Sequence, residues 1–197
     1  MIAYLQGKFA EMDPTKVIID VNGVGYEVKI SLTTYSDIKE KKEGKLQTHL
    51  QVKEDSHTLY GFSELSEKKR FLDLLSISGV GPSTGLMVLS SLSAEELQYA
   101  IVHDQVKVIQ GVKGIGLKTA QRIILELKDK MKKEGLLDKS IELSDLPDNT
   151  LFDEALSALT TLGISKPVAE KNIRSVLKSY GNSIKLEELI KQALKRA

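Results

Sequence analysis

The chain has 197 residues, of which 41% are hydrophobic and 28% charged, and its 28 Lys and Arg nearly balance its 27 Asp and Glu. Cys is absent, which excludes disulfides, thiolate zinc sites and cysteine nucleophiles. No apolar run approaches the roughly 18 residues of a membrane helix, and the N-terminus lacks the basic and apolar regions of a secretory signal, so we expect a cytoplasmic protein without membrane segments.

Residues 1–62 have the pattern of β-strands. Asn22 and Gly23, a strong hairpin signal, follow the apolar run 17–21. Apolar and polar residues then alternate over 24–30 and recur at that period over 46–52 and 58–62, as in half-buried strands. About five short strands in so few residues predict a small closed barrel.

From Ser63 to Glu134 the apolar spacing becomes helical, in short segments. Ser93 and Glu96 have the spacing of a capping box, in which each side chain bonds the other residue's backbone amide. One face of a longer helix carries apolar residues at helical spacing; these are Ala120, Ile123, Ile124, Leu127 and Met131. We therefore predict a separate all-α domain over 63–134.

The last quarter of the chain divides into a linker and a small bundle. Residues 135–150 are acidic and polar and show no sustained period, which predicts a flexible linker. Residues 151–197 carry three compact helical signals, the first closed by Gly163 and the second capped by Ser165. These signals predict an independent three-helix domain.

An internal repeat is the most informative feature. Residues 79–89 (GVGPSTGLMVL) and 114–124 (GIGLKTAQRII) share Gly–aliphatic–Gly, two residues, Thr, a small residue and then aliphatics at helical spacing. An apolar helical segment precedes each copy. This pattern is the helix-hairpin-helix motif, and two copies in one helical domain indicate a DNA-binding module that does not read sequence.

The chemistry of the repeat suits phosphate. Glycines permit the tight turn and a close approach of the backbone to another molecule, and open amides at the start of the next helix suit a phosphate oxygen. Residues 105–133 also hold eight basic against two acidic side chains, which can attract a polyanion. We predict DNA contacts from Gly79, Gly81, Ser83, Thr84, Gly114, Gly116, Lys118, Thr119 and Arg122.

Two ordinary helical hairpins with glycine caps would explain part of this repeat. Capping alone does not require the further matches of Thr84 with Thr119 and Gly85 with Ala120, so we favour the DNA-binding interpretation. Other chemistry has little support. The sequence holds no P-loop, so we expect no ATP hydrolysis by this chain, and its three scattered histidines lack metal-ligand spacing. We expect no cofactor, no metal and no catalytic residue.

One acidic pair, Glu54 and Asp55, lies at the tip of a predicted hairpin between Val52 and Thr58. From the residues alone, a solvated turn is the better interpretation. A nuclease would need several carboxylates gathered on metal ions, and no such set is evident.

Taken together, these features resemble the RuvA family of Holliday junction branch migration subunits over the full chain. The motifs that carry the resemblance are the start MIAYLQG, residues 22–28 (NGVGYEV), Glu54-Asp55 followed by LYGF at 59–62, residues 79–82 (GVGP) and residues 114–120 (GIGLKTA). The order of the predicted domains also agrees.

The resemblance implies a multidomain fold: an OB-fold barrel (1–62), a tandem helix-hairpin-helix domain (63–134), a linker (135–150) and a UBA-like domain (151–197). It implies a homotetramer, in pairs on DNA as an octamer, that holds a four-way junction open in recombination and repair. Glu54 and Asp55 would form an acidic pin facing the crossover. Residues 151–197 would dock on the RuvB ATPase, and the RuvC resolvase is a further implied partner.

The chain departs from the family pattern at both hairpins. Ser83 and Thr84 stand where many members carry Lys, which predicts that the first hairpin relies on amide and hydroxyl donors. Lys113 replaces a usual Pro, and Leu117 a frequent basic residue. These changes alter which residues contribute most to binding.

Two other functions compete with a junction scaffold. A helix-hairpin-helix glycosylase or lyase would use Lys118 as its amine nucleophile and would need a base pocket and a carboxylate, for which Asp138 is the nearby candidate. A protein-interaction adaptor would work through the terminal bundle, would not bind DNA and would leave the repeat unexplained.

Overall fold

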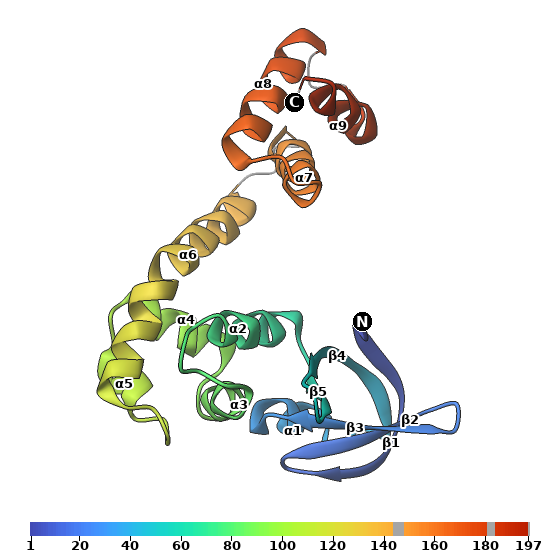
Figure 1. Ribbon diagram of the computed structural model, residues 1–197, viewed down its shortest axis with the longest axis vertical. Coiled ribbons are helices and arrows are strands. Elements are labelled where there is room, and N and C mark those ends of the chain that lie inside the picture. Colours follow the sequence, from blue (N-terminus) through green and yellow to red (C-terminus); the bar gives the residue numbers. More distant parts are fainter. Residues whose placement is uncertain (144–147, 181–183, 197) are drawn as a thin grey trace. The chain divides into compact units, whose positions relative to one another are not determined.

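Residues 4–62 form five strands that close into a barrel in the computed structural model, which describes residues 1–143, 148–180 and 184–196 (Figure 1). The strands are β1 (Tyr4–Asp13), β2 (Lys16–Val21), β3 (Val24–Ile30), β4 (Glu43–Val52) and β5 (His57–Phe62). Their order around the barrel is β1-β2-β3-β5-β4, and β4 pairs again with β1. The barrel is an OB-fold, as predicted.

One long strand and one tight turn close this barrel. The register of β1 shifts between Phe9 and Glu11, and this irregularity lets the strand pair with both β2 and β4. Asn22 and Gly23 have φ of 52° and 87° between β2 and β3, as a two-residue hairpin turn requires. Gly7 admits no side chain, because a Cβ there would lie 2.1 Å from the carbonyl oxygen of Asp20.

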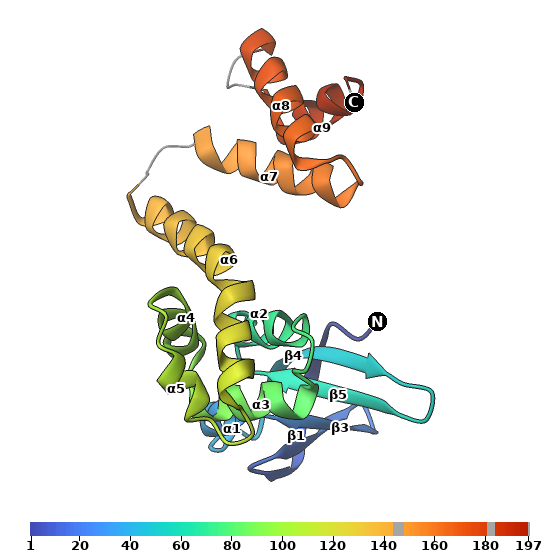
Figure 2. The ribbon, with the colours of Figure 1, turned by 60° about the vertical axis from the view of Figure 1, so that its left-hand side comes forward.

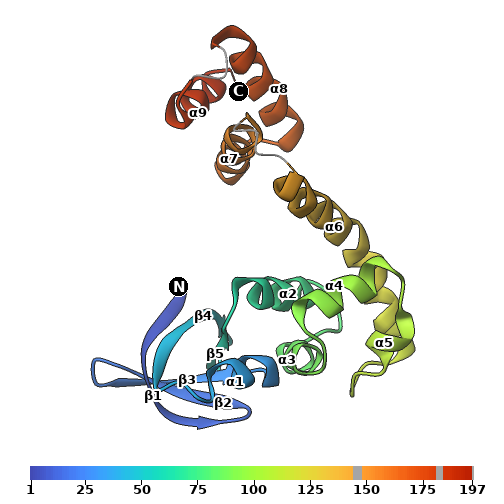
Figure 3. The same cartoon turned by 180° about the vertical axis from the view of Figure 1, so that it is seen from behind.

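A short helix that the sequence did not predict, α1 (Leu32–Ile38), joins β3 to β4 and couples the barrel to the helices. The Ser31 hydroxyl caps it by accepting from the Thr34 amide at 3.0 Å. Thr33 Oγ1 donates to the Leu89 carbonyl at 2.6 Å, and the Leu32 amide donates to Ser90 Oγ at 3.0 Å. Figures 1 and 3 show α1 between the barrel and α3.

The next described part of the chain is helical. Its helices are α2 (Leu65–Leu75), α3 (Pro82–Ser91), α4 (Ala94–Val102), α5 (Val106–Gln110) and α6 (Leu117–Leu143). Ser93 and Glu96 form the predicted capping box at the start of α4. In the part of the chain that the structure describes, no helix is long and apolar enough to cross a membrane.

The barrel and the helices share a core. Phe71 of α2 packs against Tyr60 and Phe62 of β5, with ring centroids 5.1 and 4.9 Å apart. These side chains belong to one buried cluster that continues through α3, α4 and α6. Strand gives way to helix near Ser63, where the sequence placed a domain boundary, but Met1–Gly135 form one compact unit.

The predicted linker is partly helical. Helix α6 continues through residues 135–143, and α7 begins at Asp148, so the expectation of irregular chain was wrong for 135–143 and 148–150. A long amphipathic helix needs no new nucleus to continue, and the sequence has no Pro between Leu117 and Pro147. Residues 144–147 lie outside the described residues.

The second unit contains the three predicted helices, α7 (Asp148–Thr161), α8 (Lys166–Tyr180) and α9 (Leu186–Leu194). Their aliphatic faces bury a small core of Ala155, Leu159, Ala169, Ile173, Val176, Leu189 and Ala193. Gly163, with φ of 92°, forms the turn between α7 and α8. The buried Asn172 donates from Nδ2 to the Ala193 carbonyl at 3.3 Å and so ties α8 to α9.

A buried carboxylate holds the barrel to α2. Glu67 is 4% exposed, and it accepts hydrogen bonds from the hydroxyls of Ser31 and Thr34. Burial raises the pKa of Glu67 above its usual value, the two hydroxyls oppose that rise, and the neighbouring Asp37 and Glu64 add to it. Because the folded state favours the protonated form, this residue stabilises the fold most in acid and loses that contribution as pH rises through its folded pKa.

Glu67→Gln should therefore change how stability depends on pH. We compare the free energies of unfolding of the unsubstituted protein and the variant. As pH falls from 7 toward 4.5, we expect the difference between them to change in favour of the unsubstituted protein, by about 1.4 kcal/mol for each unit by which the pKa of Glu67 is raised. Urea titrations followed by tyrosine fluorescence measure this, since five of the six tyrosines lie in Met1–Gly135.

The exposed Glu11 provides the control, because Glu11→Gln removes a carboxylate from the same barrel without touching a buried site. Burial also lowers the pKa of His49, but that effect is common to all three proteins and cancels in the differences. A difference between the unsubstituted protein and Glu67→Gln that stays constant with pH would contradict the role given to Glu67.

Candidate nucleic-acid interface

The first glycine elbow joins α2 to α3. Gly79 has φ of 92°, a conformation that favours glycine. The turn is closed by the Val80 amide, which donates to the Ile77 carbonyl at 3.0 Å. Val80 is 5% exposed, so its side chain anchors the turn in the core. Gly79 and Gly81 on either side of it are exposed.

The second elbow, between α5 and α6, repeats this geometry. Gly114 has φ of 88°, Ile115 is 5% exposed, and the Ile115 amide donates to the Val112 carbonyl at 3.1 Å. The alternation of buried and exposed positions is the same in both elbows, from Ile77–Gly81 to Val112–Gly116. The two copies are therefore one structural unit used twice.

Each elbow leads directly into a helix through a glycine. Gly81 and Gly116 accept the first intrahelical bonds, from Gly85 and Ala120, both at 2.9 Å. No side chain caps α3 at Gly81, so its first-turn amides remain open, and Pro82 contributes no amide at all. An open helix start of this kind suits a phosphate oxygen.

The matching small residues have a packing role. A Cβ at Gly85 would lie 3.1 Å from the ring of Phe71, and Ala120 at the corresponding position is fully buried. Position 85 requires a small residue because Phe71 of the preceding helix packs directly on it. Packing therefore bears on the match of Gly85 with Ala120 and leaves the match of Thr84 with Thr119 unexplained.

The space in front of the elbows is open. A Cβ added at Gly81 or Gly116 would meet nothing within 4 Å, so no contact within the described chain requires glycine there. Met87 of α3 is 39% exposed, and its sulfur lies 3.9 Å from where a Cβ of Gly114 would stand. A side chain of the helix that follows the first elbow thus contacts the turn of the second, so the two elbows lie close to each other.

The predicted side chains differ in availability. Ser83 and Lys118 are exposed, and Thr84 and Thr119 are half-buried at corresponding positions. Arg122 is exposed but already paired, because its Nε donates to Glu126 Oε1 at 2.6 Å. A phosphate that binds Arg122 must therefore displace or share it with Glu126.

Two other cations of the basic segment are also committed to the fold. Lys128 pairs with Asp104 and Lys130 with Asp73. Ion pairs within the described side chains do not involve Lys107, Lys113, Lys118, Lys132 or Lys133. The charge available to a polyanion is consequently smaller than the sequence suggests, and Lys113 and Lys118 provide it at the second elbow.

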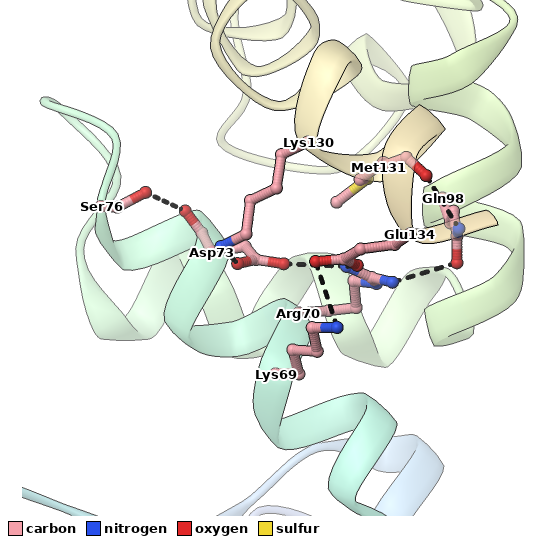
Figure 4. Close-up of polar contacts among 8 residues, drawn as sticks. All are labelled: Lys69, Arg70, Asp73, Ser76, Gln98, Lys130, Met131 and Glu134. Carbon is pink, nitrogen blue, oxygen red and sulfur yellow. Dashed lines mark hydrogen bonds and ion pairs between the residues drawn. The ribbon is translucent and has the colours of Figure 1, made fainter. Parts of the chain in front are cut away.

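A buried ion-pair network, drawn in Figure 4, links the helices that carry the elbows. Arg70 of α2 is 6% exposed, and its Nη1 donates to Asp73 Oδ2 at 2.9 Å and to Glu134 Oε2 of α6 at 2.8 Å. Its Nη2 donates to Gln98 Oε1 of α4 at 3.0 Å, and Lys130 of α6 meets the other oxygen of Asp73. One guanidinium thus ties α2, α4 and α6 together.

Contacts to cations lower the pKa of one carboxylate of the network, Glu134. Burial alone would raise the pKa of Glu134, but hydrogen bonds from Arg70 and Lys69 outweigh it and leave that pKa below its usual value. Asp73 is 3% exposed and lies between Arg70 and Lys130. Sequence analysis missed this network; its only signal was charged residues on the apolar faces of predicted helices.

The acidic pair lies at a turn, as predicted. Glu54 and Asp55 occupy the two positions between Lys53 and Ser56, and the Lys53 amide donates to the Ser56 carbonyl at 2.8 Å. All four residues are exposed. Figure 2 shows the β4–β5 hairpin projecting from the barrel on the side away from α4 and α5.

In the ranges 1–143, 148–180 and 184–196, no three or more His, Asp or Glu side chains are placed to hold a metal ion. Asp138, considered as a partner for Lys118 in a lyase, falls on α6, but its side chain lies outside the described residues.

Family models account for almost the whole chain. They match the RuvA N terminal domain at residues 1–61, a SAM-like helix-hairpin-helix tandem at 71–129 and the RuvA C-terminal domain at 150–197. The chain belongs to the RuvA family. The tandem match covers both elbows, and the N-terminal match covers the barrel with its acidic turn.

Relatives within the RuvA family match end to end. The chain is 56% identical to the Holliday junction branch migration complex subunit RuvA of Cytophaga hutchinsonii, with 99% of each chain covered. It is 50% identical to the protein of that name from Christiangramia forsetii, with all of both chains covered, and 48% identical to that of Flavobacterium psychrophilum, with 99% of each covered.

Asp73→Asn tests the network that positions the elbows. We expect it to lower the free energy of unfolding by about 2–3 kcal/mol, because Arg70 and Lys130 would lose a shared buried carboxylate while Glu134 remains. Urea titration of the full chain, followed by tyrosine fluorescence, measures the loss.

Lys69→Ala is the matched control, because its side chain is 52% exposed and meets Glu134 at the edge of the same network. Its cost should stay below about 1 kcal/mol. Equal losses for the two variants would mean that the buried pairs do not hold the helices together.

Proposed function

We propose that this chain is the DNA-binding subunit of a branch migration complex, in which it grips the arms of a four-way Holliday junction without reading their sequence. The observation that carries the proposal is the pair of matching glycine elbows, each opening a helix start onto empty space. The names of its relatives within the RuvA family support the choice of a junction over other DNA structures.

The proposed grip uses the backbone first and side chains second. Amides of Gly81, Ser83 and Thr84, and those at the corresponding positions of α6, would donate to phosphate oxygens. Lys118 would add a cation at the second elbow. Contacts to phosphates position a protein on DNA without sequence information, as a protein that moves a junction along homologous DNA requires.

The acidic turn would act by repulsion. Carboxylates of Glu54 and Asp55 would face the crossover, where several copies of the chain meet. Like charges 4 Å apart repel by about 4 kcal/mol at an effective dielectric constant of about 20. Such repulsion would disfavour continuous duplex at the centre and so favour an open junction over linear DNA.

The remaining parts of the proposal concern assembly. A homotetramer, joined on DNA by a second one, would surround the crossover. Residues 151–197 would recruit a separate RuvB-type ATPase, since the sequence of this chain holds no P-loop, and a RuvC-type resolvase would act on the same junction in the cytoplasm. The chain itself would be non-catalytic.

Gly81→Ala and Gly116→Ala test the proposed grip directly. A methyl group at either position meets nothing in the described chain, so the melting temperature should not change. The methyl would stand where a phosphate approaches, and we expect the affinity for four-way DNA to fall about tenfold, or about 1.4 kcal/mol. Fluorescence anisotropy with labelled four-way and linear DNA measures both affinities.

Gly79→Ala provides the contrast, because φ of 92° makes any side chain there costly. It should lower the free energy of unfolding by about 1–2 kcal/mol. Unchanged DNA affinity in both Gly81→Ala and Gly116→Ala would contradict contact through the elbows. Equal affinity of the unsubstituted protein for linear and four-way DNA would contradict the junction as its target.

The acidic turn makes the opposite prediction. Glu54→Gln with Asp55→Asn should raise the affinity for four-way DNA about 3- to 10-fold at low salt, and less at high salt, because repulsion is screened. Linear duplex should gain more, so the preference for the junction should shrink. Anisotropy titrations at two salt concentrations measure the effect.

A second barrel variant, Glu40→Gln with Glu43→Gln, removes the same charge from exposed positions away from the turn. It should leave the preference for the junction unchanged. Weaker binding by the Glu54→Gln, Asp55→Asn variant would rule out the repulsive role.

A further inference from the structure

A shallow depression lies where the barrel meets the helix of the first elbow. Its barrel side is formed by the turn before β2 and the end of β3, including Lys16 and Lys29. Its helical side is formed by α3, including Ser83 and Met87. The depression therefore lies beside the open helix start at Gly81. Met87, which lines it, also lies next to the turn at Gly114.

Two lysines face each other across the barrel edge of this depression. Lys16 of β2 and Lys29 of β3 are directly paired residues in an antiparallel ladder, and both are exposed. Like charges at such positions repel and destabilise a sheet. Lys16 is partly neutralised by Glu27, whose Oε2 lies 3.3 Å from its Nζ, whereas Lys29 forms no ion pair with any described side chain.

The two elbows differ sharply in charge. Residues 76–94 hold no charged side chain at all, although they include the whole first elbow and α3. The corresponding span of the second copy, 111–129, holds four basic and two acidic side chains; these are Lys113, Lys118, Arg122, Lys128, Glu126 and Asp129. Ser83 corresponds to Lys118 in the repeat, so the first elbow has the same open amides without a cation of its own.

The unfavourable lysine pair lies beside the elbow that has no cation of its own. Lys16 and Lys29 line the same depression as Ser83, the residue that lacks the charge. An anion bound there would relieve the repulsion between the lysines and would supply the counter-charge that no described side chain gives Lys29. The apolar surface of Met87 between the elbows leaves room for the sugars of a strand that passes from one elbow to the other.

We propose that Lys29, assisted by Lys16, supplies the cation for the phosphate held at the first elbow, so that the barrel is itself part of the grip on the DNA backbone. The ligand is a phosphodiester of a duplex arm. This inference rests on the proposed DNA binding, and it replaces the expectation that the first hairpin relies on amides and hydroxyls alone.

Lys29→Gln is the test, with the affinity for four-way DNA measured by anisotropy across a salt series. The slope of log affinity against log salt should fall by about 0.9, the value for one lost phosphate contact, and the affinity near 0.1 M salt should fall about 5- to 10-fold. The melting temperature should not fall, because the substitution removes a repulsion.

Lys8→Gln is the matched control, because Lys8 is an exposed lysine of the same barrel that pairs across the ladders with Asp20 and Glu43. Its salt slope should equal that of the unsubstituted protein. A Lys29→Gln slope equal to that of the control overturns the inference.

A rescue variant tests whether the two cations serve one phosphate. Ser83→Lys places the charge where the second elbow has Lys118, and in the Lys29→Gln background it should restore the slope and the affinity. A double variant that keeps the reduced slope overturns the assignment of Lys29 to the first elbow.

Lys118→Ala separates this inference from the proposed function. Loss of slope in Lys118→Ala with an unchanged slope in Lys29→Gln would leave DNA binding intact and overturn the role of the barrel. Failure of the unsubstituted chain to bind any DNA would overturn both.

Discussion

The guanidinium of Arg70 is the interaction on which the candidate interface depends. A glycine elbow is only a turn, and it can hold a phosphate only if the helices on either side of it keep their positions. Arg70 connects α2, α4 and α6 through two carboxylates and an amide, and α2 and α6 are the helices that adjoin the two elbows. Because a buried charge is costly without its partners, this arrangement penalises any relative displacement of these helices. The two elbows are thereby kept as a matched pair.

Most of the fold followed from local patterns, and the exceptions have identifiable causes. The barrel followed from alternation and the Asn22-Gly23 turn, and the terminal bundle from helical spacing with Gly163. Helix α1 was missed because its seven residues carry no clear apolar stripe, and its tie to α3 through Thr33 is a long-range contact. The helical part of 135–143 was missed because a weakly patterned segment can continue a helix that is already formed.

The candidate site divides in the same way. The glycines, their anchors Val80 and Ile115, and the small residues at 85 and 120 could be predicted because each obeys a local geometric rule that the sequence states twice. The pairing of Lys130 with Asp73 could not, since it joins two helices far apart in the sequence, whereas the Arg122–Glu126 pair and the facing of Lys16 and Lys29 follow from local helix and hairpin register and were overlooked. The sequence shows which side chains are charged, whereas the fold determines which of them are already paired within the protein and which can still bind a ligand.

The packing of Phe71 sets a dimension of the molecule. This ring rests on Phe62 and Tyr60 of β5, the strand that leads out of the acidic hairpin, and lies beneath Gly85 of α3, one turn beyond the first elbow. The strand that follows the acidic turn and the helix that follows the first elbow thus share one buried aromatic contact, which restricts how far they can move relative to each other. In the proposed complex, DNA would have to adapt to this preset geometry, which would favour a junction whose strands can part over a stiff linear duplex.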